Sequence, residues 1–105
     1  MIKAGFCIRD DAAQFTVTGH AGAGDAGEDV VCAAVSSAAY MAANTVTEIL
    51  GTEAEADVRD GYMRFSFGGS KAAADIVRGL RLHLLSLQEQ YPDNVKVMTE
   101  VSGNA

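Results

Sequence analysis

The chain has 105 residues, 49% of them hydrophobic, with one proline and a formal net charge of −6. This length predicts one domain over residues 1–105 whose core needs no disulfide staples, and the composition excludes disordered and multidomain architectures. The acidic balance argues against direct nucleic-acid binding and favours attraction for a basic peptide.

The first elements predicted are two strands and a loop. Residues 2–9 alternate apolar and polar side chains, as a half-buried strand does. A second alternating run over 14–18 follows a short turn, so the two strands are expected to form a hairpin. That run ends at Gly19. Residues 20–28 are rich in glycine and alanine, which predicts a loop with much backbone freedom.

A long helix is predicted next, over about residues 30–50, because apolar residues recur there at spacings of three and four. Asp29 is the expected N-cap, and Gly51 is the expected residue just beyond the C-cap. If Asp29 caps the helix, Cys32 is its third residue.

Two short strands follow at 54–59 and 62–67, and Asp60-Gly61 between them is a tight-turn signal. The side chains expected to face the core are those of Ala56, Val58, Met63, Phe65 and Phe67.

The remaining chain predicts a helix and a last strand. Ser70 is the expected cap of a helix over 71–91, which Pro92 ends. A strand is predicted over 95–101, with a frayed tail at 102–105. The order β-β-α-β-β-α-β predicts an α+β fold, a mainly antiparallel sheet of about five strands with both long helices on one face.

The sequence predicts a cytoplasmic protein with free thiols. Three charged residues, Lys3, Arg9 and Asp10, fall within the first ten positions, too early for a secretory signal. No uninterrupted apolar stretch reaches the length of a membrane span, so no membrane contact is expected. A single disulfide is improbable in such a compartment.

The segment from Gly19 to Ser36 concentrates the candidate chemistry. His20 lies at a strand end, and Cys32 is expected in the first turn of a helix, whose positive end stabilises a thiolate. An imidazole nearby can take the thiol proton and later protonate a leaving amine. Free N–H groups at the helix start are expected to hold an oxyanion.

Each of these residues also has a plainer interpretation. Cys32 is compatible with simple packing in an alanine-rich helix, and His20 with a solvated loop position. Asp29 is favoured as an N-cap, with orientation of His20 as the alternative. Two Cys and two His have no metal-ligand spacing, so no metal and no cofactor are predicted.

Other features receive weaker predictions. The G-x-G-x-x-G match from Gly22 to Gly27 is a poor dinucleotide signal, because acidic residues crowd the following helix start. Cys7 lies on the polar side of its strand and is expected to be inert. His83 is expected to be half-buried at the edge of the core. Leu82 and Leu85 point away from the main apolar stripe, a modest sign of a homodimer surface.

The segment resembles the bacterial ribosomal-processing cysteine protease (Prp) family. The matching pattern is Gly-His-Ala-Gly, a short glycine-containing loop, then Gly-x-Asp-x-Val-Cys-Ala-Ala-Val-Ser. In this chain those residues are Gly19, His20, Ala21 and Gly22, then Gly27, Asp29, Val31, Cys32, Ala33, Ala34, Val35 and Ser36.

The resemblance implies a cysteine endopeptidase with Cys32 as nucleophile and His20 as general base and acid. Asp29, Ser36 and Gly19 are then supporting residues, and Gly22, Gly24 and Gly27 belong to a loop over the substrate. The implied substrate is the N-terminal extension of a large-subunit ribosomal protein (the bacterial L-twenty-seven type). The family is cytosolic, tends to be homodimeric and needs no metal.

Two other functions stay open at this point. One is a non-catalytic ribosome-associated or assembly protein that uses the glycine-rich loop for binding. The other is a small-molecule or nucleotide-binding module.

Overall fold

The computed structural model describes residues 1–19 and 26–99, with the backbone alone for residues 26–29. In chain order the elements are β1 (Ile2–Ile8), β2 (Ala13–Thr18), α1 (Ala26–Asn44), a π-helical turn η1 (Thr45–Ile49), β3 (Ala54–Arg59), β4 (Tyr62–Phe67), α2 (Lys71–Gln90) and β5 (Val95–Thr99). The predicted order is confirmed. The predicted tail at 102–105 lies outside the described residues.

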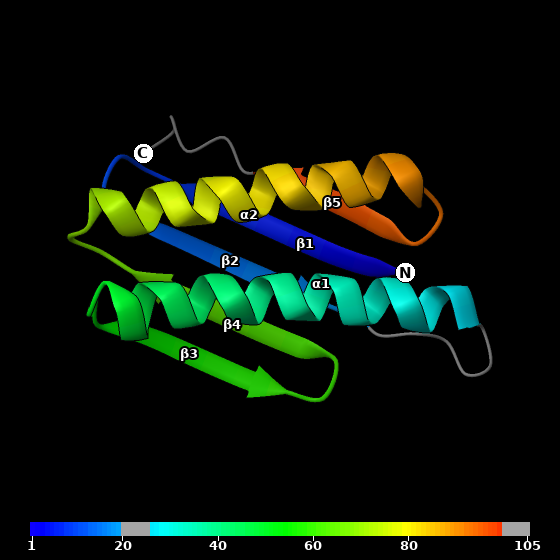
Figure 1. Cartoon of the computed structure of the whole chain (residues 1–105), viewed down its shortest axis with the longest axis horizontal. Coiled ribbons are helices and arrows are strands. Elements are labelled where there is room, and N and C mark those ends of the chain that lie inside the picture. Colours follow the sequence, from blue (N-terminus) through cyan, green and yellow to red (C-terminus); the bar gives the residue numbers. More distant parts are fainter. Residues whose placement is uncertain (20–25, 100–105) are drawn as a thin grey trace.

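The five strands form one mixed sheet in the order β3-β4-β2-β1-β5. Both predicted hairpins are present, β1 with β2 and β3 with β4, and β2 also pairs antiparallel with β4. The last strand pairs parallel with β1, and α2 is the crossover that carries the chain from β4 to this edge of the sheet. Both helices run antiparallel across one face of the sheet, as predicted (Figure 1).

The core lies between that face and the two helices. Alternate side chains of β1, β2 and β4 point into it. At its centre the centroid of the Phe15 ring lies 6.0 Å from that of Phe6 and 5.5 Å from that of Phe65. Every buried side chain among the described residues is apolar. The other face of the sheet carries the polar members of the alternation, such as Lys3, Thr16 and Arg64.

The inward prediction for β3 is wrong in part. Ala56 and Val58 share a face with the buried side chains of Phe65 and Met63, their register partners, yet both are exposed. The reason is that β3 is an edge strand, and the helices that bury its neighbour leave most of it uncovered.

The long first helix ends close to its predicted C-terminus. Its last turn is η1, and Thr45 donates its hydroxyl to the carbonyl of Met41 at 2.8 Å, a back-bond typical of Ser and Thr in helices. Gly51 follows the C-cap with a φ of +67°, as predicted. The stretch Val30–Ile49 has the length and composition of a membrane span, but Val35 and Val46 are buried in the core.

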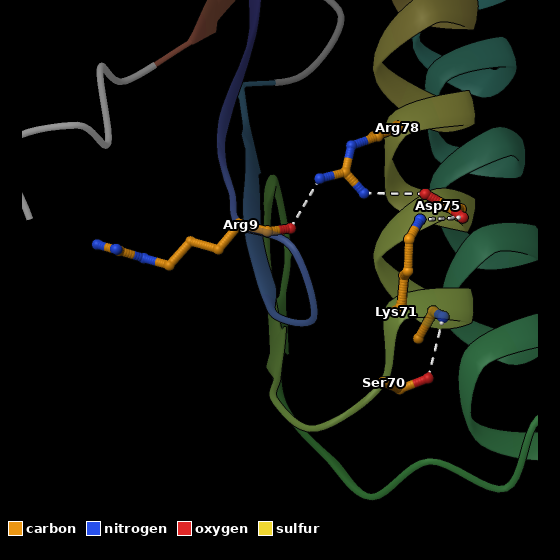
Figure 2. A network of polar contacts seen from close by, with 6 residues as sticks. Arg9, Ser70, Lys71, Asp75 and Arg78 are labelled. Atoms are coloured by element: carbon orange, nitrogen blue, oxygen red, sulfur yellow. Dashed lines mark hydrogen bonds and ion pairs between the residues drawn. The ribbon is translucent and has the colours of Figure 1, made fainter.

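The second helix is anchored at its start (Figure 2). Ser70 Oγ accepts a hydrogen bond from the N–H of Ala73 at 3.0 Å, which confirms the predicted cap. Arg78 contacts Asp75 at 2.9 Å and donates to the carbonyl of Arg9 at 2.8 Å, so α2 is tied to the β1–β2 turn. The hydrogen bond from Lys71, assisted by Arg78, lowers the pKa of the Asp75 carboxyl.

Candidate functional site

Cys32 is held on α1 by a regular pattern of burial. Its neighbour Val31 and the next core residue, Val35, are buried against the sheet, so this part of the helix has a fixed rotation. The Cys32 side chain is half-buried and packs at the edge of the core. The thiol is free.

The predicted helix start is wrong, and this changes the electrostatics. The helix begins at Ala26, so Asp29 is its fourth residue instead of its N-cap, and Cys32 follows Ala26 by six residues. An acidic residue in the first turn is stabilised by the helix dipole, which lets the helix extend backwards past Asp29. The N–H groups that have no partner within the helix are those of residues 26–29, about one turn before Cys32.

Gly27 is likewise helical, where the sequence predicts a loop. Glycine weakens a helix interior by about 1 kcal/mol relative to alanine, and the alanine-rich segment that follows offsets this cost. The prediction of a substrate-covering loop that includes Gly27 is therefore wrong at this residue. His20, Gly22 and Gly24 lie outside the described residues.

A cavity of about 240 Å³ opens beside Cys32. One wall is the α1 stripe that contains Cys32, Ser36 and Tyr40, which are spaced four residues apart and lie one helical turn after another. Ser36, a predicted supporting residue, therefore shares this wall with the thiol. Tyr40 is 46% exposed.

The floor and the opposite wall of this cavity come from the sheet. Val17 and Met63 form part of the lining from β2 and β4, and the tight turn at 59–62 closes one side. The predicted turn at Asp60-Gly61 is present, and Gly61 in it has a φ of +69°, which favours glycine. The N–H of Gly19 donates to the carbonyl of Gly61 at 2.9 Å.

Gly19 brings the end of β2 to the same cavity. Its φ is +95°, and a Cβ atom there would collide with the carbonyl oxygen of Met1. Only glycine fits this combination of backbone angle and close approach. The residue that directly precedes His20 in the sequence thus lines the cavity that holds the Cys32 side chain.

Sequence reasoning missed Tyr40 and the turn at 59–62 as parts of this site. The spacing of Tyr40, eight residues after Cys32, was a signal that it shares the helix face. The turn carried no such signal, because its position beside α1 depends on the pairing of β4 with β2.

A second, larger hollow of about 680 Å³ lies between α1 and α2, on the side of α1 away from this cavity. It is lined mainly by small and apolar residues, together with Asp75 and with His83, which is exposed and not half-buried as predicted. The prediction failed because residues on that side of α2 face the gap between the helices. Leu82 is 67% exposed, as its outward spacing predicts.

The remaining predicted groups lie apart from the cavity. Cys7 is half-buried on the polar face of the sheet, which the helices do not cover. Over residues 1–19 and 26–99, no group of three or more His, Cys, Asp or Glu side chains is placed to hold a metal ion.

The chain is similar to known proteins in both sequence and fold. The family model described as cysteine protease Prp matches residues 1–96. The ribosomal processing cysteine protease Prp of Bacillus subtilis (strain 168) is 32% identical to the chain over 95 residues, which cover 83% of the chain and 85% of that protein.

Solved structures share the fold. The essential ribosomal processing protease Prp from S. aureus, crystallised with a substrate peptide, superposes with a TM-score of 0.85 at 20% identity, over 95% of this chain and 100% of that one. Its complex with a covalently linked product peptide gives 0.80 at the same identity and coverage. SMU.848 from Streptococcus mutans gives 0.69 at 28% identity, over 95% of this chain and 96% of that one.

Proposed function

The chain belongs to the ribosomal-processing cysteine protease (Prp) family, and from this membership we propose that Cys32 is its catalytic nucleophile and His20 its general base and acid. It is a cysteine protease of ribosomal-protein processing. The observation that carries the assignment of Cys32 is the position of this free thiol, half-buried at the edge of a cavity of about 240 Å³.

The reaction follows from the chemistry of a thiol paired with an imidazole. His20 takes the Cys32 proton, and the thiolate attacks the peptide carbonyl carbon to form a tetrahedral intermediate. As the C–N bond breaks, the imidazolium gives its proton to the leaving amine. The acyl group stays on Cys32 as a thioester. Water, deprotonated by the same imidazole, then hydrolyses this thioester, and the imidazolium returns its proton to the Cys32 thiolate.

Three further residues have supporting roles in the proposal. Ser36 is one turn after Cys32 on the cavity wall, and its hydroxyl is proposed to hydrogen-bond to groups near the thiol. Gly19 lines the cavity immediately before His20 and fixes where the chain leaves β2. Asp29 is three residues before Cys32 and, as a first-turn residue, is proposed to orient His20. Gly22 and Gly24 are proposed to belong to a loop over the substrate.

The proposed substrate is the N-terminal extension of the large-subunit ribosomal protein L-twenty-seven. A chain with a net charge of −6 is electrostatically suited to a basic ribosomal segment. Asp60, in the turn beside the cavity, adds an acidic group at the site itself. We place this activity in the cytoplasm and in one domain over residues 1–105, with no cofactor, no metal, no membrane and no direct nucleic-acid contact.

A homodimer is also part of the proposal. Leu82 and Met41 are each 67% exposed, and Met41 lines the hollow between the two helices. Exposed apolar side chains and a mainly apolar hollow are typical of interaction surfaces. The hollow is on the side of α1 away from Cys32, so a partner copy seated there leaves the cavity open.

Cleavage of a synthetic peptide tests the nucleophile. The peptide covers the extension and the first mature residues of the host's own L-twenty-seven protein, and the products are measured by mass spectrometry. We expect cleavage by the natural chain, none by Cys32→Ser, and unchanged cleavage by the control Cys7→Ser. Cleavage by Cys32→Ser would overturn the proposal. Binding without cleavage by the natural chain would instead support the non-catalytic ribosome-associated function.

A further inference from the structure

An exposed apolar side chain, that of Val58, adjoins the lining of the cavity beside Cys32. Met63 lines the cavity, and its register partner on the next strand is Val58, on the same face of the sheet. The helices cover Met63 but leave Val58 48% exposed. Val58 therefore extends the apolar surface of Met63 toward β3, and Tyr40 lines the same cavity as Met63 from α1, with Arg59 and Asp60 in the turn that closes one side.

We propose that Tyr40 and Val58 hold one apolar side chain of the peptide substrate, three or four residues away from the scissile bond. This rests on the proposed role of Cys32. Tyr40 follows Cys32 by eight residues on α1, which is about 12 Å along the helix axis. An extended peptide advances about 3.3 Å per residue, so a chain lying beside α1 reaches Tyr40 after three or four residues.

The chemistry of the two side chains defines what they accept. Tyr40 presents an aromatic ring on a rigid helix, and Val58 a branched aliphatic group on a paired strand, at positions that remain accessible in the free chain. An aliphatic or aromatic side chain between them removes apolar surface from water on both sides. Tyr40 is thus a specificity-determining residue, distant from the reacting atoms.

Kinetics of peptide cleavage test this role. Tyr40→Ala is expected to raise KM for the L-twenty-seven peptide about five- to tenfold and to change kcat less than twofold, because the contact is made equally in bound substrate and transition state. Tyr40→Phe should keep the natural KM, since the ring remains. Tyr91→Ala is the matched control, because Tyr91 is an exposed tyrosine at the end of α2 that does not line the cavity.

Peptide variants identify the partner side chain. Alanine replaces the peptide residues three and four positions from the scissile bond, on each side in turn. One of these peptides lacks the side chain that contacts Tyr40. For that peptide the natural chain and Tyr40→Ala should have equal KM values, because the contact is already absent. In the non-cleaving Cys32→Ala background, fluorescence anisotropy should show the same pattern in Kd.

The outcomes separate this inference from the proposed function. If the natural chain cleaves the peptide but Tyr40→Ala behaves like Tyr91→Ala, the Tyr40 contact is wrong and the protease assignment stands. If Tyr40→Ala weakens every peptide equally, its effect is structural and the inference is also overturned. Absence of cleavage by the natural chain contradicts the proposed function itself.

Discussion

At the scale of single residues, Gly19 is a position whose backbone admits no side chain. Its φ of +95° already disfavours any L residue, and the carbonyl oxygen of Met1 occupies the space of a Cβ atom. Two separate constraints therefore meet at the residue before His20. Gly69 has a comparable φ of +80°, but nothing lies within 4 Å of the Cβ position there.

This pair allows the two constraints to be separated. Gly69→Ala should lower the free energy of unfolding by about 1–3 kcal/mol, the typical cost of a strained backbone angle. Gly19→Ala should lower it further, because the collision with Met1 adds to that cost, and it should also reduce peptide cleavage. Urea denaturation measures the stabilities. Equal losses for both variants would contradict the close contact at Gly19.

The two cysteines form a natural internal comparison. Both are free and half-buried, so accessibility alone predicts similar alkylation rates. If His20 activates Cys32, iodoacetamide should modify Cys32 about tenfold faster than Cys7 at pH 7, because the thiolate is the reacting form. Peptide mapping by mass spectrometry measures both rates in one sample. His20→Ala should bring the Cys32 rate down to that of Cys7, and equal rates in the natural chain would count against an activated thiol.

At the scale of secondary-structure elements, the sequence predicted the turns and caps that depend on neighbouring residues alone. The turn at Asp60-Gly61 and the cap at Ser70 are confirmed because each depends on a few neighbouring residues. The start of α1 was misplaced, since Gly27 and Asp29 are also typical of loops and caps, and the helix dipole together with the alanine-rich continuation decides the outcome.

Burial of β3 was not predictable from its own residues. The alternation of apolar and charged residues in β3 indicates correctly that Ala56 and Val58 share one side of the sheet, because side-chain direction alternates along a single strand. Whether anything covers that side depends on the strand order, which places β3 at the edge of the sheet. This order arises from pairings between distant segments.

The anchor of α2 leads to a pH-dependent prediction. The pKa of Asp75 is lowered by its hydrogen bond from Lys71 and by Arg78, so the ionised carboxylate stabilises the folded chain. That contribution is present above the unfolded pKa of an aspartate and is lost as the pH falls through the lower folded value. Asp75→Asn should therefore lower Tm slightly at pH 7, and the difference from the natural chain should disappear toward low pH.

The control for this variant removes a charge without removing an ion pair. Asp10→Asn changes an exposed carboxylate in the turn that follows β1. Thermal unfolding followed by circular dichroism between pH 3 and pH 7 compares the two variants. A Tm difference for Asp75→Asn that stays constant over this range would argue against a stabilising carboxylate.

At the scale of the whole molecule, the exposed surface of the helices predicts self-association. Analytical ultracentrifugation should show a species of twice the 10.9 kDa chain mass. Leu82→Lys should shift it to the monomer, because a charge then replaces an apolar side chain that is 67% exposed in a single chain. Met98→Lys, a similar change on the other face of the sheet, should leave the dimer intact. A natural chain that sediments as a monomer would contradict the proposed surface.

The candidate site as a whole was predictable in part. Cys32, Ser36 and Gly19 were singled out from the sequence, and all three line one cavity. These residues come together because the end of β2 and the helix α1 are close in sequence. Tyr40 and the turn at 59–62 complete the same cavity from parts of the fold that only sheet pairing brings together.

The edge position of β3 also bears on the tendency of the protein to aggregate. An edge strand with an exposed apolar side is a template for pairing with other chains, and this protein keeps Ala56 and Val58 exposed on such a strand. On the opposite side of β3, every second residue is charged, namely Glu55, Asp57 and Arg59. Charges on an edge strand oppose stacking of one copy on another. The strand can therefore offer an apolar surface to a peptide and still resist growth into an aggregate.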